Sequence, residues 1–407
     1  MRAALLSLIE TVPGGAALRG ALPLANGQLG MLQVDLARQA GAGEILCLVS
    51  SVGTKVRQIE TYAAACGVSF HLVRSVADIS VRLASDDELL IIADGLYVAP
   101  EDMPQLARET GTFLTSFAPG EGERSLIERF ERIDINHIWA GLACVRARDL
   151  VDARDLPDDW SVQSALLRLA VQRGYRRQVL PFALAEAGRL AIVRDAAEVE
   201  ALALQELAGS TGALGGRLVR LPPVQTLARR AWAARWIQPT LRIAALALPV
   251  GAIGLAIVDW SMTALGVLVA GRFAGHVANR LFGRFAGTRM PAAEQTARDA
   301  ASALAFIAIT ILTVAASDRL AGLFAALILP ALALVLGRLS PPLARSVPRF
   351  WLGLARSPSL IALAAFVAIP FGLVLPVLMV WNLMLVALML WQTRPGTLAT
   401  DPPRPHI

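Results

Sequence analysis

Four acidic residues of this chain have the side-chain type and the setting that a divalent-metal site needs. Asp94 ends the apolar run ELLIIAD, and Asp159 precedes a helical pattern. Glu294 and Asp299 lie between apolar stretches in the second half. Because carboxylate oxygens are the preferred ligands of Mg²⁺ and Mn²⁺, these residues are the candidate metal ligands. For Asp159 a capping role at a helix N-terminus is the favoured alternative.

A second set of candidates is basic and lies in GRFAGHVANRLFGRFAGTRM (271–290), where only arginines interrupt the apolar runs. Arginine donates paired hydrogen bonds to phosphate oxygens, so the stretch is a candidate site for a phosphate or an anionic headgroup. The alternative is that the arginines only mark the cytosolic side of a membrane. The candidate residues are Arg272, Gly275, Arg280, Arg284 and Arg289.

The first half of the chain contains the elements that would position Asp94. Short apolar or β-branched runs at 44–50, 67–73, 88–94, 137–145 and 189–194 predict strands, and helical patterns separate them. Alternation of strands and helices at this spacing predicts a mostly parallel α/β sheet. An Asp at the carboxyl end of such a strand would face the ligand crevice of the sheet.

The second half is of a different kind. The chain has 407 residues, is 55% apolar and has a mean hydropathy of +0.55. From Arg217 onward, eighteen arginines face five acids, so this part carries +13 and the preceding part −7 of the net +6. The high pI therefore describes a membrane half and gives no reason to expect nucleic acid binding.

Six apolar stretches are each close to the ~20 residues that cross a bilayer. Arginines concentrate in alternate connections between them, which predicts by the positive-inside rule that both termini are cytosolic at the cytoplasmic (inner) membrane. Trp232 and Trp236, with arginines beside them, predict a juxtamembrane amphipathic helix. The expected spans are roughly 241–258, 261–278, 299–316, 320–337, 359–375 and 376–392.

The chain thus divides into four predicted parts. They are a cytosolic α/β domain (1–209), a juxtamembrane helix (210–239), an all-α six-helix transmembrane domain (240–393) and a cytosolic tail (394–407). The three cysteines all lie in the first part without metal-ligand spacing, which predicts reduced, buried thiols. The first fifteen residues do not have the pattern of a cleaved signal peptide, since Glu10 ends their apolar run.

Residues 20 to 190 resemble the nucleotidyltransferase branch of the GT-A glycosyltransferase-like fold. The resemblance rests on LPLANGQLGMLQVDLARQAGAGEILCLVS and on DDELLIIADGLYVAPEDMPQL, and it implies that Asp94 binds metal and nucleotide. The family's Gly-rich phosphate loop, G-x-G-T-R-[LM] followed by Lys, is replaced by PLANGQLGM, which has no basic residue. The nucleotide-binding candidates there are Asn26, Gly27 and Gly30.

The membrane half resembles the CDP-alcohol phosphotransferases, whose signature is D-x2-D-G-x2-A-R-x8-G-x3-D-x3-D. Gly275 and Ala278 match the signature's first Gly and its Ala, and none of its four aspartates is present. Glu294 and Asp299 lie two and three residues from the last two acidic positions. The resemblance therefore implies a degenerate relative of enzymes that transfer a phosphoalcohol from a CDP-activated donor.

Two readings of function follow. In the first, the chain is an integral membrane protein of phospholipid or polar-headgroup metabolism that binds CTP or a CDP-alcohol with Mg²⁺ or Mn²⁺ and anionic headgroups. In the second, it is a non-catalytic scaffold or regulatory partner of an active lipid synthase, or a homo-oligomer. A transporter is disfavoured because no acid pairs with a base inside the predicted spans. The sequence does not decide whether the chain is an enzyme, and no catalytic residue is assigned.

Overall fold

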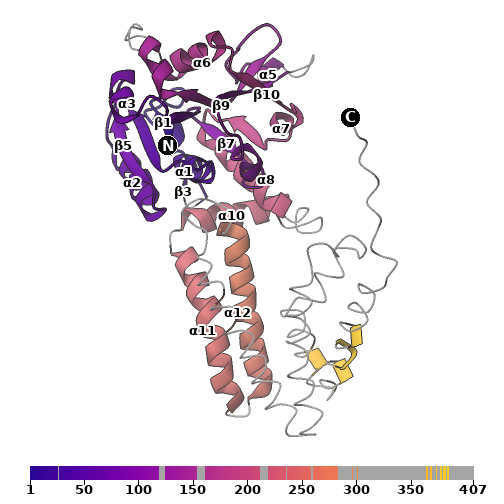
Figure 1. Ribbon diagram of the computed structural model, residues 1–407. Coiled ribbons are helices and arrows are strands. Elements are labelled where there is room, and N and C mark those ends of the chain that lie inside the picture. Colours follow the sequence, from indigo (N-terminus) through magenta and orange to yellow (C-terminus); the bar gives the residue numbers. More distant parts are fainter. Residues whose placement is uncertain are drawn as a thin grey trace, which may run out of the picture. The chain divides into compact units, whose positions relative to one another are not determined.

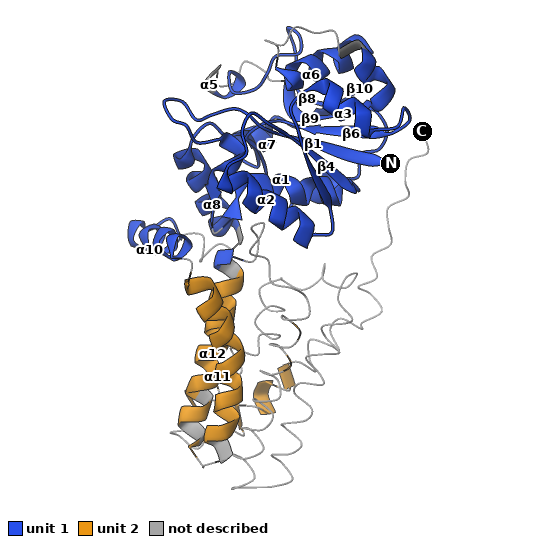
Figure 2. Ribbon diagram, turned by 90° about the vertical axis from the view of Figure 1, so that its left-hand side faces the viewer, with its two compact units in different colours: residues 1–235, 280–289 blue, residues 236–279, 290–407 orange. Residues whose placement is uncertain are grey.

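The structure is a computed structural model of the chain, and the residues it describes group into two compact units. One unit contains residues 1–235 and 280–289, the other 236–279 and 290–407, coloured separately in Figure 2. The described residues are 1–25, 27–118, 124–153, 161–210, 219–234, 236–257 and 260–282, with single positions at 296, 300, 364, 367–368, 373, 376–377, 379–381 and 383–384.

A seven-stranded sheet forms the centre of the first unit, in the order β10-β8-β9-β6-β1-β4-β5 (Figure 1). All neighbouring pairs are parallel except those of β9, which runs antiparallel to β6 and β8. The mostly parallel sheet predicted from the sequence is therefore confirmed. The strands are β1 (Arg2–Leu8), β4 (Glu44–Val49), β5 (Ser69–Val73), β6 (Glu88–Ile92), β8 (Phe113–Phe117), β9 (Ile138–Arg146) and β10 (Arg176–Leu180).

Burial explains the strand sequences. β6 and β9 are central and almost wholly buried, so they read as continuous apolar runs. β10 lies at an edge and exposes most of its residues, which is why RRQVL carries no strand pattern. The sequence analysis missed β1, β8 and β10, and its predicted strand at 189–194 is β11 (Leu190–Ile192). β11 pairs with β7 (Leu96–Val98) in a separate small sheet.

Helices alternate with the strands. α1 packs against β1, and α6 packs against β8 and β9. A second small sheet pairs β2 (Pro23–Leu24) with β3 (Gly27–Gln28). The helices are α1 (Leu29–Gln39), α2 (Thr54–Ala65), α3 (Val76–Arg82), α4 (Met103–Leu106), α5 (Arg124–Ile127), α6 (Val162–Gln172), α7 (Ala183–Glu186) and α8 (Ala196–Ser210), with 3₁₀ turns at Arg19–Ala21 and Ala147–Ala153.

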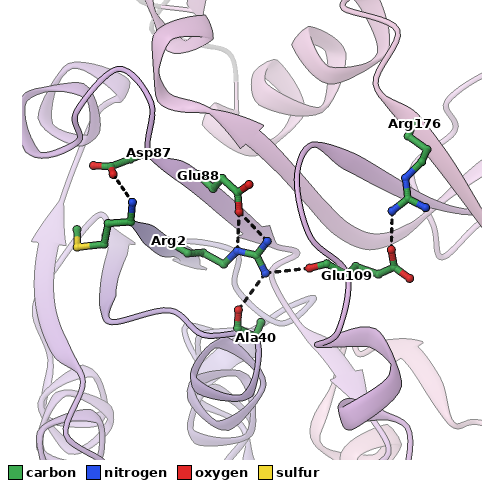
Figure 3. A network of polar contacts seen from close by, with 7 residues as sticks. Arg2, Ala40, Asp87, Glu88, Glu109 and Arg176 are labelled. Atoms are coloured by element: carbon green, nitrogen blue, oxygen red, sulfur yellow. Dashed lines mark hydrogen bonds and ion pairs between the residues drawn. The ribbon is translucent and has the colours of Figure 1, made fainter.

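A polar network fixes the edge of the sheet where β1 and β6 begin (Figure 3). Arg2 donates to Glu88 Oε2 at 2.6 and 2.9 Å, and its Nη1 reaches the carbonyls of Ala40 and Glu109, both at 2.9 Å. Glu109 in turn pairs with Arg176 of β10. The network joins strands from the middle and the edge of the sheet, at the end opposite to Asp94.

The three cysteines are free thiols: Cys47 and Cys144 are buried, as predicted, whereas Cys66 is only half-buried. Burial raises the pKa of Cys47 far above its usual range and that of Cys144 to about 12. Both thiols are therefore protonated and unreactive at neutral pH.

The helices of the predicted juxtamembrane and membrane regions are α10 (Pro222–Ala233), α11 (Ile237–Ile257) and α12 (Ser261–Phe282). Within the described residues, one helical segment, Ile237–Leu255, is long and apolar enough to cross a membrane. α12 packs on α11 where Gly271 faces Leu248 and Pro249, at a distance that leaves no room for a side chain. The four later predicted spans lie outside the described residues apart from single positions, so the six-span domain stays a prediction.

Candidate functional site

Asp94 lies at the carboxyl edge of the sheet, where sequence reasoning placed it. β6 is the middle strand and ends at Ile92, and its parallel neighbour β1 ends at Leu8. Because parallel strands end at the same edge, the residues that follow β1 meet those that follow β6. Asp94 Oδ2 accepts the backbone N–H groups of Glu10 at 2.8 Å and of Ile9 at 3.0 Å. The carboxylate thus holds the start of the loop that follows β1.

Asp94 is almost completely buried, with 3% of its surface exposed. Burial raises its pKa to about 7, against the opposing effect of the two backbone donors, because a charge is costly in a poorly hydrated interior. The carboxylate of Glu10 raises the pKa further, and the Arg19 guanidinium lowers it. Asp94 therefore titrates near neutral pH, whereas an exposed Asp would be fully ionised there.

Arg19 closes the loop that Asp94 holds. It forms an ion pair with Glu10, and its Nε is buried without a hydrogen-bond partner. Asp94 Oδ1 is likewise buried without a partner. Gly20 is tight against Leu8: a Cβ there would lie 2.1 Å from Leu8 Cδ2, and at an ordinary contact distance of 3.8 Å from Asp94 Oδ1. This part of the sheet edge thus contains two buried polar atoms without hydrogen-bond partners.

Three further polar residues approach this edge from α6 and from the segment between α5 and β9. Gln163, in the first turn of α6, accepts the N–H of Asp94 at 2.9 Å. Glu131 accepts from Ser164 at 3.3 Å, and burial raises its pKa, which nearby Glu10 raises further. Sequence reasoning singled out none of these residues, nor Glu10 and Arg19. A usable signal was the turn sequence VPGG directly after the apolar run of β1.

The described residues do not make a divalent-metal site around Asp94. No group of three or more His, Cys, Asp or Glu within the described part of the chain could hold a metal ion. One carboxylate oxygen of Asp94 accepts hydrogen bonds from two amides. The other is so close to Gly20 that a Cβ added to Gly20 would contact it at 3.8 Å. Mg²⁺ keeps several waters and needs octahedral room, which this packing does not provide. We therefore derive no chemical step through a metal.

For the other three acidic candidates the structure does not test a position near Asp94. Asp159, Glu294 and Asp299 lie outside the described residues. Their assignment as metal ligands remains a prediction from the sequence.

The nucleotide-binding candidates are in a different place from the one expected. The loop after the first strand is residues 9–18, because β1 ends at Leu8, so PLANGQLGM is not the counterpart of the phosphate loop. Gly27 pairs with Leu24 in a two-residue strand, and Gly30 lies inside α1, where a Cβ would meet Ile59 and the Gly20 carbonyl. Gly30 is therefore a packing residue. Asn26 lies outside the described residues.

The candidates for a phosphate or headgroup site begin on a helix, which contains the span predicted at 261–278 and extends beyond it. α12 continues without interruption to Phe282, so Arg272, Gly275 and Arg280 are helical. Gly275 is buried and Arg272 half-buried. Arg284 and Arg289 lie outside the described residues. The proposed headgroup site is therefore seen only in part.

Comparison with known proteins gives a likeness in structure alone. No protein-family model matches the chain, and no curated protein matches it in sequence. A UDP-glucose pyrophosphorylase from Acinetobacter baumanii matches 54% of this chain and 97% of its own, with 11% identity and a TM-score of 0.39. A UDP-glucose pyrophosphorylase in complex with UDP-glucose matches 52% of this chain and 100% of its own, with 10% identity and a TM-score of 0.35.

The fold assignment rests on the chain's own topology. The first half is a mostly parallel α/β sheet with an acidic residue after its middle strand, which agrees with the nucleotidyltransferase-like domain expected from the sequence. The surroundings of that acid differ from the expectation. Asp94 is buried and accepts hydrogen bonds from backbone amides, whereas it was expected to face an open ligand crevice.

Proposed function

We propose that this chain is a membrane protein of phospholipid or polar-headgroup metabolism whose nucleotidyltransferase-like domain is a non-catalytic scaffold or regulatory module. The observation that carries the proposal is the state of Asp94, which is buried and bound to the amides of Ile9 and Glu10. In the family that the sequence resembles, the corresponding acid binds metal and nucleotide. In this chain the acid instead binds backbone amides of the loop formed by residues 9–18.

The loop itself supports the same proposal. Residues 9–18 contain Gly14 and Gly15 but no basic residue, and Arg19, which follows, is paired with Glu10. A loop that binds a triphosphate needs amides and cations directed at the anion. Two amides of this loop are directed at Asp94 instead.

The membrane assignment is supported by composition and by the candidate span Ile237–Leu255. The lipid assignment rests on the resemblance of residues 271–296 to the CDP-alcohol phosphotransferases. A scaffold of this kind would bind an active lipid synthase or a second copy of itself at the cytoplasmic membrane. The topology is tested with a reporter fused after Ile407: a cytosolic reporter is expected, and a reporter outside the cytosol would contradict the six-span arrangement.

The competing function is an active fusion enzyme that binds CTP or a CDP-alcohol through a metal. Melting temperatures of the full-length protein in detergent separate the two, because a ligand of the folded state raises the melting temperature. CTP, UTP and CDP-choline are each added with and without Mg²⁺, to the wild type and to Asp94→Asn. We expect no shift that needs both Mg²⁺ and Asp94. A shift of several degrees that needs both would establish the enzyme reading.

A further inference from the structure

A pocket of about 240 Å³ lies between residues 126–130, the segment from α7 to β11, and α8. Its walls are apolar and come from all three segments: Leu126, Phe130, Leu190, Ile192 and Leu202. None of Glu10, Asp94 and Glu131 lines it, so the pocket is distinct from the edge of the sheet described above.

The size of the pocket limits its ligand. Sites for drug-sized molecules and cofactors measure roughly 300–1,000 Å³, so this pocket is too small for a nucleotide or a CDP-alcohol. A molecule with about six to eight non-hydrogen atoms would fill it.

The rim of the pocket carries a net negative charge. Arg129 pairs with Glu198 at 2.8 Å, and a second oxygen of Glu198 accepts the N–H of Arg194 at 2.8 Å. Glu186, also on the rim, is exposed and has no partner among the described residues. One carboxylate therefore remains for a ligand after the ion pair is formed.

The aromatic wall suits a cation as well. Phe130 is fixed by an edge-to-face contact with Phe117, with ring centroids 5.3 Å apart. A cation above an aromatic face is attracted by the electrons of the ring, and the attraction increases where water is excluded.

We propose that the pocket between residues 126–130, β11 and α8 binds a small organic ammonium ion, with its ammonium group between Phe130 and Glu186 and the rest of its apolar body against Leu202. The proposal rests on the pocket alone and holds whether or not the domain acts in lipid metabolism. Its failure is therefore distinguishable from the failure of the proposed function.

Three probes of the same shape and different charge test the proposal: choline, neutral 3,3-dimethylbutan-1-ol and anionic 3,3-dimethylbutanoate. Each is titrated into the full-length protein in detergent by calorimetry. We expect one choline per chain with a Kd of about 0.1–1 mM, a usual range for a ligand of this size. The neutral probe should bind about two- to fivefold more weakly, as expected for the loss of an ion pair with an exposed carboxylate. Equal binding of the three probes, or no choline binding at 10 mM, would overturn the proposal.

Four variants locate the site. Glu186→Gln should weaken choline binding about two- to fivefold, as for an exposed ion pair. Ala201→Leu, which adds a side chain on the α8 wall, should abolish it. Arg129→Gln frees Glu198 and should strengthen choline binding. Asp86→Asn removes an exposed carboxylate that does not line the pocket and should change nothing. If Ala201→Leu does not fold, Glu186→Gln and the three probes still decide. Unchanged binding in Glu186→Gln would contradict the assigned site.

Discussion

Replacing Asp94 with Asn tests which of two opposing effects controls this carboxylate. Burial disfavours its charged form, whereas the N–H groups of Ile9 and Glu10 favour it, and the balance raises its pKa to about 7. An acid with a raised pKa in the folded state holds a proton there that the unfolded chain has already released. Its contribution to stability is therefore lost as the pH rises, from the unfolded value near 3.8 to about 7.

The magnitude follows from these two values. Between pH 5 and pH 8, ionisation of Asp94 should lower the free energy of unfolding by about 2–3 kcal/mol. Asn does not titrate, and its carbonyl oxygen still accepts both backbone N–H groups. The stability of Asp94→Asn relative to the wild type should therefore rise by the same amount over that interval, while other groups contribute equally to both proteins and cancel.

Hydrogen exchange of the full-length protein measures this difference within the domain itself. Amides of β1 and β6 exchange by opening of the sheet, and the intrinsic rates at each pH are the same in both proteins. The ratio of protection between Asp94→Asn and the wild type should increase about 70-fold from pH 5 to pH 8. A constant ratio would show that the two backbone donors outweigh burial, because a carboxylate whose folded pKa is at or below 3.8 is ionised in both states throughout this interval.

Three further predictions concern Glu10, Gly95 and Gly271. Glu10→Gln removes a like charge near Asp94 and should move the midpoint of the same pH dependence to lower pH; an unchanged midpoint would contradict the coupling. Gly95→Ala should destabilise the domain by about 3 kcal/mol, because Gly95 has φ +73° and a Cβ would lie 2.6 Å from the Val193 carbonyl oxygen. Gly111→Ala, at φ +72° in open space, should cost only about 1 kcal/mol, and equal melting temperatures of the two variants would refute the steric argument. Gly271→Val places a side chain 2.8 Å from Pro249 Cδ and should lower the melting temperature in detergent, whereas Gly254→Val, with no atom within 4 Å of its Cβ, should lower it less.

The sequence predicted three inner strands because they are buried on both faces. β4, β6 and β9 read as apolar runs, and that pattern needs no knowledge of the neighbouring strands. β10 and β8 were missed for the opposite reasons: β10 is exposed at the edge, and β8 buries Thr115, whose hydroxyl bonds the Leu142 carbonyl of β9. A buried polar residue is satisfied by a partner that only the folded chain supplies.

Of the residues in the candidate site, only Asp94 could be predicted from the sequence. Asp94 follows an apolar run, and its place at the carboxyl edge follows from the parallel sheet. Its partners come from residue 9 onward and from α6, which are distant in sequence, so the spacing of residues did not indicate them. The expected phosphate loop was placed at Asn26 to Gly30 because β1 was not recognised as the first strand.

The most direct test of the account is release of pyrophosphate by the full-length protein. The purified chain is incubated with CTP or UTP, a set of phosphoalcohols and phosphosugars, and Mg²⁺ or Mn²⁺, beside Asp94→Asn. A non-catalytic domain predicts equal background release from both proteins with every donor and acceptor. Metal-dependent release by the wild type that Asp94→Asn abolishes would contradict the account, because Asp94 would then take part in nucleotidyl transfer.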